Sequence, residues 1–566
     1  MPRSRQQSPS SLVSDLARMA VTELSPAIGR SIGRTLGIKR SSLADLVLAS
    51  DVAAKFLEGA SFELRSRASS NAQGVEETPS LIKHSAARVV QAVLSDHRLR
   101  KRVSELEQSV RVTVSPKTRG GVRLHQMRGR MEELTLADAR PDEKHLAKTV
   151  AFLQAEGFSI ERVGRFSVTA TAPAQLVSEL LKVALAVGVS RRPSIDRALR
   201  MFSAGLEAPE PEDLFVAPRE SIAVPGLRIH ASIDDIVFVP PPRPSVAAAP
   251  PPVNYPVLGA SAMRRCLGID AQTRDGAGIS VAVVDTGFYV DHPVFKKGNF
   301  DFKAVDTEPD ESGHGTAMAW NILNVAPRCR LRGYRKEDPS GAIERAADEG
   351  ARIISCSWGW PDEQTFSTLQ LSIRSVIEED GVTVVFAAGN GERFWPASDP
   401  LVVAVGGVYA DPASGALQAS DFASGFRSDL NSNRNVPDVS GLCGLAPRGI
   451  YLPLPVPPGS LADVDSHGFA FPDKDETGID DGWIYDSGTS SATAQVAGIV
   501  ALMAQHAASR GITLSPEQVK RCLKRASTAV ENGRNAFGVP AIGQPNIAVG
   551  WGLVNAQAAL QEVDRL

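Results

Sequence analysis

The chain has 566 residues, of which 43% are hydrophobic and 22% are charged, and its formal net charge is −3. This length allows several domains, and the composition is that of an ordinary globular protein. The nearly balanced charge argues against nucleic acid or an anionic membrane surface as the partner, because either would favour a basic face. No apolar run is long enough to predict a transmembrane helix.

The N-terminus, MPRSRQQSPSSLVSDLARMA, lacks the apolar core of a secretory signal. The five cysteines are scattered and form no Cys-x-x-Cys pair, which argues against a disulfide framework or a zinc site. We therefore expect a cytoplasmic protein of a reducing compartment, with export by an unconventional route as the alternative. The cysteines themselves are expected to be small apolar filler.

Residues 1–110 carry apolar side chains at helical spacing, as in SSLADLVLASDVAAKFLEGA and SLIKHSAARVVQAVL. We predict a helical N-terminal region. Two roles stay open for it: a structural module, or a docking and regulatory module that binds another protein.

Residues 111–240 predict the order strand, helix, strand, strand, helix, strand, with helices in PDEKHLAKTVAFLQAEGF and APAQLVSELLKVALAVG. This order is typical of a ferredoxin-like α+β domain. Its last strand is either SIAVPGLRIH or DDIVFVP. Residues 241–256 are rich in proline, so we expect an exposed and extended linker there.

The pattern becomes α/β from residue 257 to residue 566. Apolar runs rich in β-branched residues, ISVAVVD, ARIISCSW, TVVFAAGN and LVVAVGG, alternate with helical stretches. Such runs are typical of strands buried on both faces of a parallel sheet. We predict a doubly wound parallel sheet, with the active site beyond the carboxyl ends of its strands.

Polar residues occupy special places in this region. Asp285 ends the run ISVAVVD, His314 lies between two glycines at the start of a predicted helix, and Ser490 begins a long apolar helix. A serine hydroxyl becomes nucleophilic when a histidine removes its proton, and a carboxylate fixes the tautomer of that histidine. Asn390 ends another run, where its amide can donate to an oxyanion together with the Ser490 N–H. The set predicts nucleophilic acyl transfer.

These segments resemble those of the subtilisin-like serine proteases, peptidase family S8. The resemblance rests on the segments VAVVDTGFYVDHPVF, SGHGTAMA, SCSWGW, VVFAAGN, GTSSATAQVAG and VGWGLVNAQAAL, which occur in the family's order over about residues 257–566. The sedolisins share a similar serine segment but use a glutamate in place of His314. Two positions depart from the family pattern: Ala494 replaces the usual proline, and Gln495 replaces a frequent histidine.

The resemblance implies a subtilisin-like fold and serine endopeptidase activity. It implies that Asp285 orients the histidine, that His314 is the general base and acid, that Ser490 is the nucleophile, and that Asn390 donates to the oxyanion. The alternative is a catalytically inactive pseudoprotease that binds peptides in the same groove.

The resemblance also implies the substrate-binding segments. Ser357, Trp358 and Gly359 correspond to the strand that aligns an extended peptide. Ala388 and Gly389, together with the bulky Trp358 side chain, are expected to border nearby pockets.

Family members often carry an α+β prodomain, so we expect residues 111–240 to act as an intramolecular inhibitor and chaperone of a zymogen. Autoprocessing is expected between about residues 205 and 256. The expected partners are a protein or peptide substrate, this prodomain, and a protein docked on residues 1–110.

The predicted chemistry requires no cofactor and no metal. Calcium is the alternative to a solvated loop for a group of acidic residues in the insertion at 441–486, Asp473, Asp475, Glu476, Asp480 and Asp481. The insertion itself is expected either to carry this loop or to shape the cleft. His292 is expected to mark a loop after Asp285 rather than to act as a second catalytic histidine.

Overall fold

The computed structural model describes residues 109–127, 130–182, 185–189, 214–218, 223–225, 230–239, 257–270, 273–362, 365–431, 434–446, 451–466, 477–478 and 480–566. The helical region predicted for the N-terminus and the proline-rich linker therefore lie outside the described residues, apart from 109–110. The chain divides into two compact units.

The first unit holds a five-stranded antiparallel sheet in the order β2-β3-β1-β7-β6. Helix α6 follows β1, and helix α7 follows β3. Without β6, this is the strand order of a ferredoxin-like sheet. The elements are β1 (Val110–Pro116), α6 (Glu143–Ala155), β2 (Ser159–Val163), β3 (Val168–Ala172), α7 (Ala174–Leu181), β6 (Ala223–Pro225) and β7 (Ile233–Val237).

The second predicted helix of this unit is shorter than expected. It ends at Leu181 because Lys182 adopts a left-handed conformation with φ of 53°. Residues Leu185–Val189 form strand β4 instead, which pairs with β5 (Leu214–Pro218). The valines of this segment favour a strand over a helix, which explains the error. The two alternatives for the last strand both form strands, β6 and β7.

The second unit is built on a mostly parallel sheet in the order β22-β23-β19-β15-β13-β11-β8-β10-β9, and β16 pairs with β15. The four predicted apolar runs form β8, β11, β13 and β15. The strands are β8 (Ser280–Asp285), β9 (Asp301–Ala304), β10 (Arg330–Arg335), β11 (Ile353–Cys356), β13 (Thr383–Ala387), β15 (Val403–Ala410), β16 (Leu417–Ala419), β19 (Val439–Leu442), β22 (Ser527–Thr528) and β23 (Leu553–Val554).

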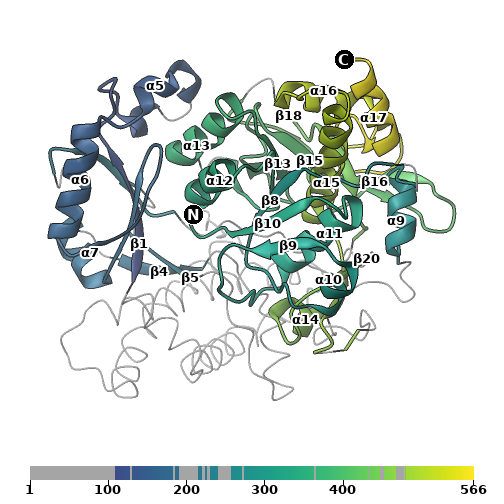
Figure 1. The fold of residues 1–566 in the computed structure, drawn as a ribbon, viewed down its shortest axis with the longest axis horizontal. Helices are drawn as coiled ribbons and strands as arrows, with labels where there is room; N and C mark the ends of the chain where they lie inside the picture. The colour runs from purple at the N-terminus through teal and green to yellow at the C-terminus, as the bar shows by residue number, and fades with distance from the viewer. Residues whose placement is uncertain are drawn as a thin grey trace, which may run out of the picture. The chain divides into compact units, whose positions relative to one another are not determined.

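Both faces of this sheet are covered. Val281 and Val283 of β8 belong to the apolar cluster that includes α11 and α15, while the alternate residues Ala282 and Val284 are also fully buried. Helix α15 lies against β11, β13 and β15, and its place beside β13 and β15 can be followed in Figure 1. The helices of this unit are α5 (Leu136–Ala139), α9 (Ala260–Cys266), α10 (Pro293–Gly298), α11 (His314–Val325), α12 (Pro339–Asp348), α13 (Ser367–Glu378), α14 (Leu461–Ser466), α15 (Thr489–Ala508), α16 (Pro516–Arg525) and α17 (Ala556–Asp564).

Short elements complete the second unit. They are the 3₁₀ turns η1 (Leu124–Met127) and η2 (Met131–Glu133), and the strand pairs β12 (Trp360–Pro361) with β14 (Phe394–Trp395), β17 (Phe426–Arg427) with β18 (Asn435–Val436), and β20 (Leu452–Pro455) with β21 (Trp483–Asp486). Within the described ranges, no helix has both the length and the apolar character needed to cross a bilayer.

Two segments of the predicted prodomain, residues 117–142 and 164–167, group with the second unit. Leu124, Met131 and Phe166 share an apolar cluster with Leu371 of α13. Arg165 adds polar contacts. Its backbone N–H donates to Glu344 at 3.0 Å, and its guanidinium lies 2.6 Å from Asp348 and 2.8 Å from Asp380.

A buried carboxylate ties the sheet to α16. The Asp438 carboxylate accepts hydrogen bonds from the two terminal guanidinium nitrogens of Arg434, both at 2.6 Å. The ammonium groups of Lys520 and Lys524 lie 3.1 and 3.0 Å from it. It also accepts from the backbone N–H of Ala404 in β15. Burial alone would raise the pKa of Asp438, but these cations hold it well below its ordinary value.

Replacing Asp438 with Asn should lower the free energy of unfolding by about 3–5 kcal/mol, because three cations lose their partner and Arg434 is itself buried. Denaturant unfolding of the full chain measures this loss. Asp429→Asn is the matched control, since Asp429 pairs with Arg393 but its side chain is 74% exposed, and it should cost less than about 1 kcal/mol. Equal losses in the two variants would contradict the buried network.

Candidate active site

The predicted catalytic residues gather at one edge of the sheet. Asp285 is the last residue of β8, Ser357 follows β11, and Asn390 follows β13. Because these strands are parallel neighbours, their carboxyl ends meet at the same edge. His314 and Ser490 come to that edge from the amino-terminal turns of α11 and α15.

His314 is hydrogen-bonded to a buried carboxylate. Its Nδ1 donates to Asp285 Oδ1 at 2.7 Å, and the same oxygen accepts from the Thr286 N–H at 2.8 Å. Burial disfavours the imidazolium, but the charge and hydrogen bond of Asp285 outweigh it and raise the pKa of His314 above its ordinary value. Asp310 acts in the same direction, and Lys336 acts against it. The pair can therefore stabilise a proton taken from a nucleophile.

Ser490 occupies the first turn of α15 and is 4% exposed. Its hydroxyl donates to the carbonyl of Ser357 at 3.2 Å, and the Ser357 hydroxyl donates to the carbonyl of Ser490 at 3.0 Å. His314 Nε2 has no hydrogen-bond partner among the described residues. The Ser490 hydroxyl must therefore turn from Ser357 toward His314 before a proton is transferred.

Hydrogen bonds to its oxygen fix the side-chain amide of Asn390. Its Oδ1 accepts from the backbone N–H and from the hydroxyl of Thr489, both at 2.9 Å. Its Nδ2 is buried and has no partner within the described chain, so this donor is available to a substrate oxygen. Gly488 makes room for it, since a Cβ at Gly488 would lie 2.6 Å from Nδ2. The sequence pattern did not predict that Thr489 binds Asn390, although its hydroxyl next to Ser490 could have suggested a hydrogen-bonding role.

The segments expected to bind substrate lie beside Ser490, with one correction. The indole N–H of Trp358 donates to the carbonyl of Val284 at 2.6 Å, and its ring packs edge-on against Phe386. The side chain is directed into the core and is 1% exposed, so the expectation that it borders a pocket is wrong. A large ring with one donor finds both apolar contacts and an acceptor there.

Gly359 and Gly389 both lie close against neighbouring atoms. A Cβ at Gly359 would lie 2.8 Å from the Phe394 ring, and one at Gly389 would lie 2.3 Å from the carbonyl oxygen of Glu392. Gly389 also has a φ of 114°, which larger residues rarely adopt. Ala388 is fully buried, so the expectation that its side chain borders a pocket is wrong as well.

The insertion after β19 reaches the residues that precede His314. The backbone N–H groups of Leu461 and Ala462 donate to the carbonyls of Glu311 and Ser312 at 3.0 and 3.1 Å. This contact favours the interpretation that the insertion shapes the cleft. Asp481 caps its own turn through the N–H groups of Gly478 and Trp483.

The calcium prediction stays untested. Asp473, Asp475 and Glu476 lie outside the described residues. In the described part of the chain, no group of three or more His, Cys, Asp or Glu side chains is placed to hold a metal ion. The five cysteines are unpaired.

His292 has a structural role. Its Nδ1 accepts from the Val294 N–H and caps α10, its Nε2 bonds to the Gly482 carbonyl at 3.0 Å, and its ring packs on Trp483. Burial lowers its pKa, which keeps the ring neutral for these contacts.

The two departures from the family pattern are accommodated. Helix α15 is continuous from Thr489 to Ala508, with Ala494 fully buried inside it. Gln495 is also buried, and its side-chain oxygen accepts from the Leu442 N–H at 2.8 Å.

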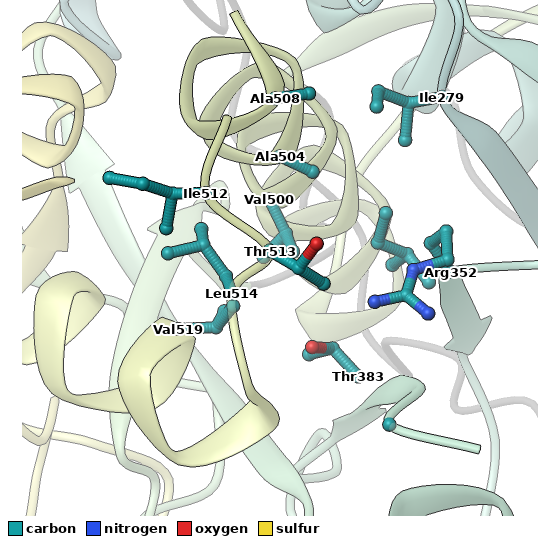
Figure 2. Close-up of a pocket in the computed structure, with 12 residues that line it drawn as sticks. Ile279, Arg352, Thr383, Val500, Ala504, Ala508, Ile512, Thr513, Leu514 and Val519 are labelled. Atoms are coloured by element: carbon teal, nitrogen blue, oxygen red, sulfur yellow. The ribbon is translucent and has the colours of Figure 1, made fainter. Parts of the chain in front are cut away.

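A small hollow of about 100 Å³ lies at the opposite, amino-terminal edge of the same strands (Figure 2). Arg352 and Thr383 border it together with Val500, Ala504 and Leu514. These are mainly apolar groups without a nucleophile or general base, so the hollow is separate from the candidate active site.

Known proteases are similar to the second unit of this chain. The sequence profile of the subtilase family, peptidase S8, matches residues 276–552. Subtilisin DY of Bacillus licheniformis is 26% identical over 323 residues, which is 52% of this chain and 94% of that protein. A calcium-dependent protease of Nostoc is 25% identical, over 51% of this chain and 46% of its own length. Among solved structures, the prenylagaramide maturation protease PagA covers 54% of this chain and 98% of its own, with 24% identity and a TM-score of 0.36.

The fold and the matching profile define a protease of the subtilisin class. Over residues 276–552 the chain is similar to the subtilase family, and its relatives identify it as a serine endopeptidase.

Replacing Gly488 with Ala should reduce turnover of a peptide substrate about 100-fold, because the new methyl group displaces the Asn390 amide. The backbone at Gly488 is extended, with φ of 176°, so the loss would not come from backbone strain. Gly259→Ala is the matched control, since nothing lies within 4 Å of its Cβ position. Wild-type turnover in Gly488→Ala would contradict the role of the amide.

The rate of labelling by a fluorophosphonate, which reacts with an activated serine, should fall as the pH is lowered, with a midpoint above the ordinary histidine pKa of 6.5. A raised pKa keeps His314 protonated to higher pH, and a protonated imidazole cannot accept the Ser490 proton. A midpoint below 6.5 would contradict the effect assigned to Asp285.

Proposed function

We propose that this protease cleaves peptide bonds of protein substrates through Asp285, His314 and Ser490, with an acyl-enzyme intermediate. The observation that carries the proposal is the 2.7 Å hydrogen bond from His314 to the buried Asp285. It leaves Nε2 of His314 as the proton acceptor, on the side of the ring away from the carboxylate.

In the first half-reaction, the Ser490 Oγ attacks the substrate carbonyl carbon while its proton moves to His314 Nε2. Asp285 stabilises the imidazolium that forms. The negative charge on the carbonyl oxygen is stabilised by Asn390 Nδ2 and by the Ser490 N–H, whose helix terminus adds a favourable field. The imidazolium then protonates the leaving amine, and an ester between Ser490 and the acyl group remains.

In the second half-reaction, water takes the place of the amine. His314 removes a proton from it, the hydroxide attacks the ester carbon, and the Ser490 Oγ leaves with the proton returned by His314. The substrate backbone is proposed to lie extended along residues 357–359 and to form main-chain hydrogen bonds with them.

We further propose that the chain is made as a zymogen whose residues 111–240 inhibit the catalytic domain. Support comes from two segments of this region, residues 117–142 and 164–167. They contact helices α12 and α13 and group with the second unit. Autoprocessing is proposed for residues 205–256, because the proline-rich sequence of residues 241–256 predicts an extended chain that a protease can reach.

The intact mass of the full chain, followed over time, tests this proposal. The wild type should split within residues 205–256, whereas Ser490→Ala should stay whole because it lacks the nucleophile. The same cleavage in both proteins would point to a contaminating protease and contradict autoprocessing. If neither protein splits and neither reacts with a fluorophosphonate, the chain is a peptide-binding pseudoprotease.

A protein partner is proposed for residues 1–110. Deleting them should reduce cleavage of the natural protein target while hydrolysis of a short peptide is retained. Unchanged cleavage of the target would contradict a docking role.

A further inference from the structure

Asp310 has no assigned role in the triad, yet its carboxylate is the centre of the turn that carries His314. The side chain is 2% exposed. Its Oδ1 accepts from the Thr286 hydroxyl at 2.8 Å and from the Gly313 N–H at 3.0 Å. Its Oδ2 accepts from the N–H and the hydroxyl of Thr316 at 3.0 and 2.5 Å. Both oxygens are thus fully used inside the protein.

These donors surround the two catalytic partners. Gly313 and Thr316 lie on either side of His314 along the chain, and Thr286 directly follows Asp285. The Thr286 hydroxyl also accepts from the Gly315 N–H at 3.0 Å. One carboxylate therefore joins the end of β8, where Asp285 sits, to the first turn of α11, where His314 sits.

The end of β8 and the first turn of α11 are closely packed against each other. A Cβ at Gly315 would lie 2.2 Å from the carbonyl oxygen of Gly287, and one at Gly287 would lie 2.9 Å from the Asp310 Cα. If the Asp310 carboxylate is lost, the N–H groups of Gly313 and Thr316 lose their partner in a buried place, which is costly. The turn would then have to shift, and His314 would shift with it.

The charge of Asp310 acts on His314 as well. The charged groups with the largest effect on the pKa of His314 are Asp285 at the end of β8, Lys336 after β10 and Asp310 before α11. The two carboxylates favour the imidazolium, and Lys336 disfavours it. Asp310 therefore adds to the stabilisation of the proton that His314 receives from Ser490.

We propose that Asp310 is a positioning residue of this protease: it fixes His314 against Asp285 and helps to stabilise the imidazolium during acyl transfer. The proposal rests on the proposed function, because the imidazolium is formed in that reaction. Asp310 itself is not a catalytic residue, since its oxygens are occupied by backbone N–H groups and threonine hydroxyls.

The test compares the full chain with its Asp310→Asn and Thr286→Val variants. The rate of fluorophosphonate labelling at Ser490 is measured across the pH range in which histidine titrates. In Asp310→Asn, the rate on the high-pH plateau should fall about 100-fold, because His314 is misplaced. The midpoint of the acidic limb should also move to lower pH, because the loss of a negative charge makes His314 harder to protonate.

The Thr286→Val variant separates the effect of Asp310 on the position of His314 from the effect of its charge. It removes the link between Asp310 and the Gly315 N–H but leaves the carboxylate in place. Its plateau rate should fall while its midpoint stays at the wild-type value. Asp399→Asn is the matched control, because Asp399 is a similarly buried carboxylate, 4% exposed, bonded to Leu401 and Gln370 away from His314. It should keep both the wild-type plateau and the wild-type midpoint.

An Asp310→Asn variant that keeps the wild-type midpoint would overturn the proposal, because a purely structural loss lowers the folded fraction without moving a pKa. A wild-type plateau in both variants would overturn it too. If the wild type itself is not labelled at any pH, the proposed function fails instead. Should Asp310→Asn not fold, a wild-type plateau in Thr286→Val decides against the proposal, and a lowered plateau with an unchanged midpoint supports it.

Discussion

The hydrogen bond between His314 Nδ1 and Asp285 Oδ1 is the constraint around which the catalytic unit is organised. It joins the end of a central strand to the beginning of a helix, so the strand must end within hydrogen-bond distance of the point where the helix begins. The glycines around it are required for the same reason, since Gly315 and Gly287 are in backbone contact. A buried carboxylate without this partner would be strongly disfavoured, so fold and chemistry share one contact.

A second contact between the start of a helix and the end of a strand positions Ser490. The first turn of α15 carries Ser490, and Thr489 beside it anchors the Asn390 amide that follows β13. Helix α15 is buried along most of its length, so its position is fixed by the core and not by the active site alone. The proposed oxyanion donors are therefore held in place without a substrate, which is the condition under which such donors accelerate a reaction.

Much of this was predictable from the residues. The apolar runs that end in Asp285 and Asn390 predicted buried parallel strands. Because parallel strands place their carboxyl ends together, they also predicted that these residues share one edge of the sheet. The glycines flanking His314 marked the start of a helix. The partners of these residues were not predictable. Asp310 and Thr489 act through contacts formed by segments that meet only in three dimensions, and the direction of the Trp358 indole depends on one distant carbonyl, that of Val284. In the front half, the valine-rich end of the second helix was a local ambiguity that tertiary pairing with β5 decided.

The measurement that tests the account most directly is fluorophosphonate labelling of the wild type, His314→Ala and Ser490→Ala, with the modified residue located by peptide mapping. The account predicts rapid labelling of the wild type at Ser490 alone, a large loss of rate in His314→Ala, and no labelling in Ser490→Ala. Labelling that persists at the wild-type rate in His314→Ala, or that maps to another serine, would contradict the assignment of the catalytic residues.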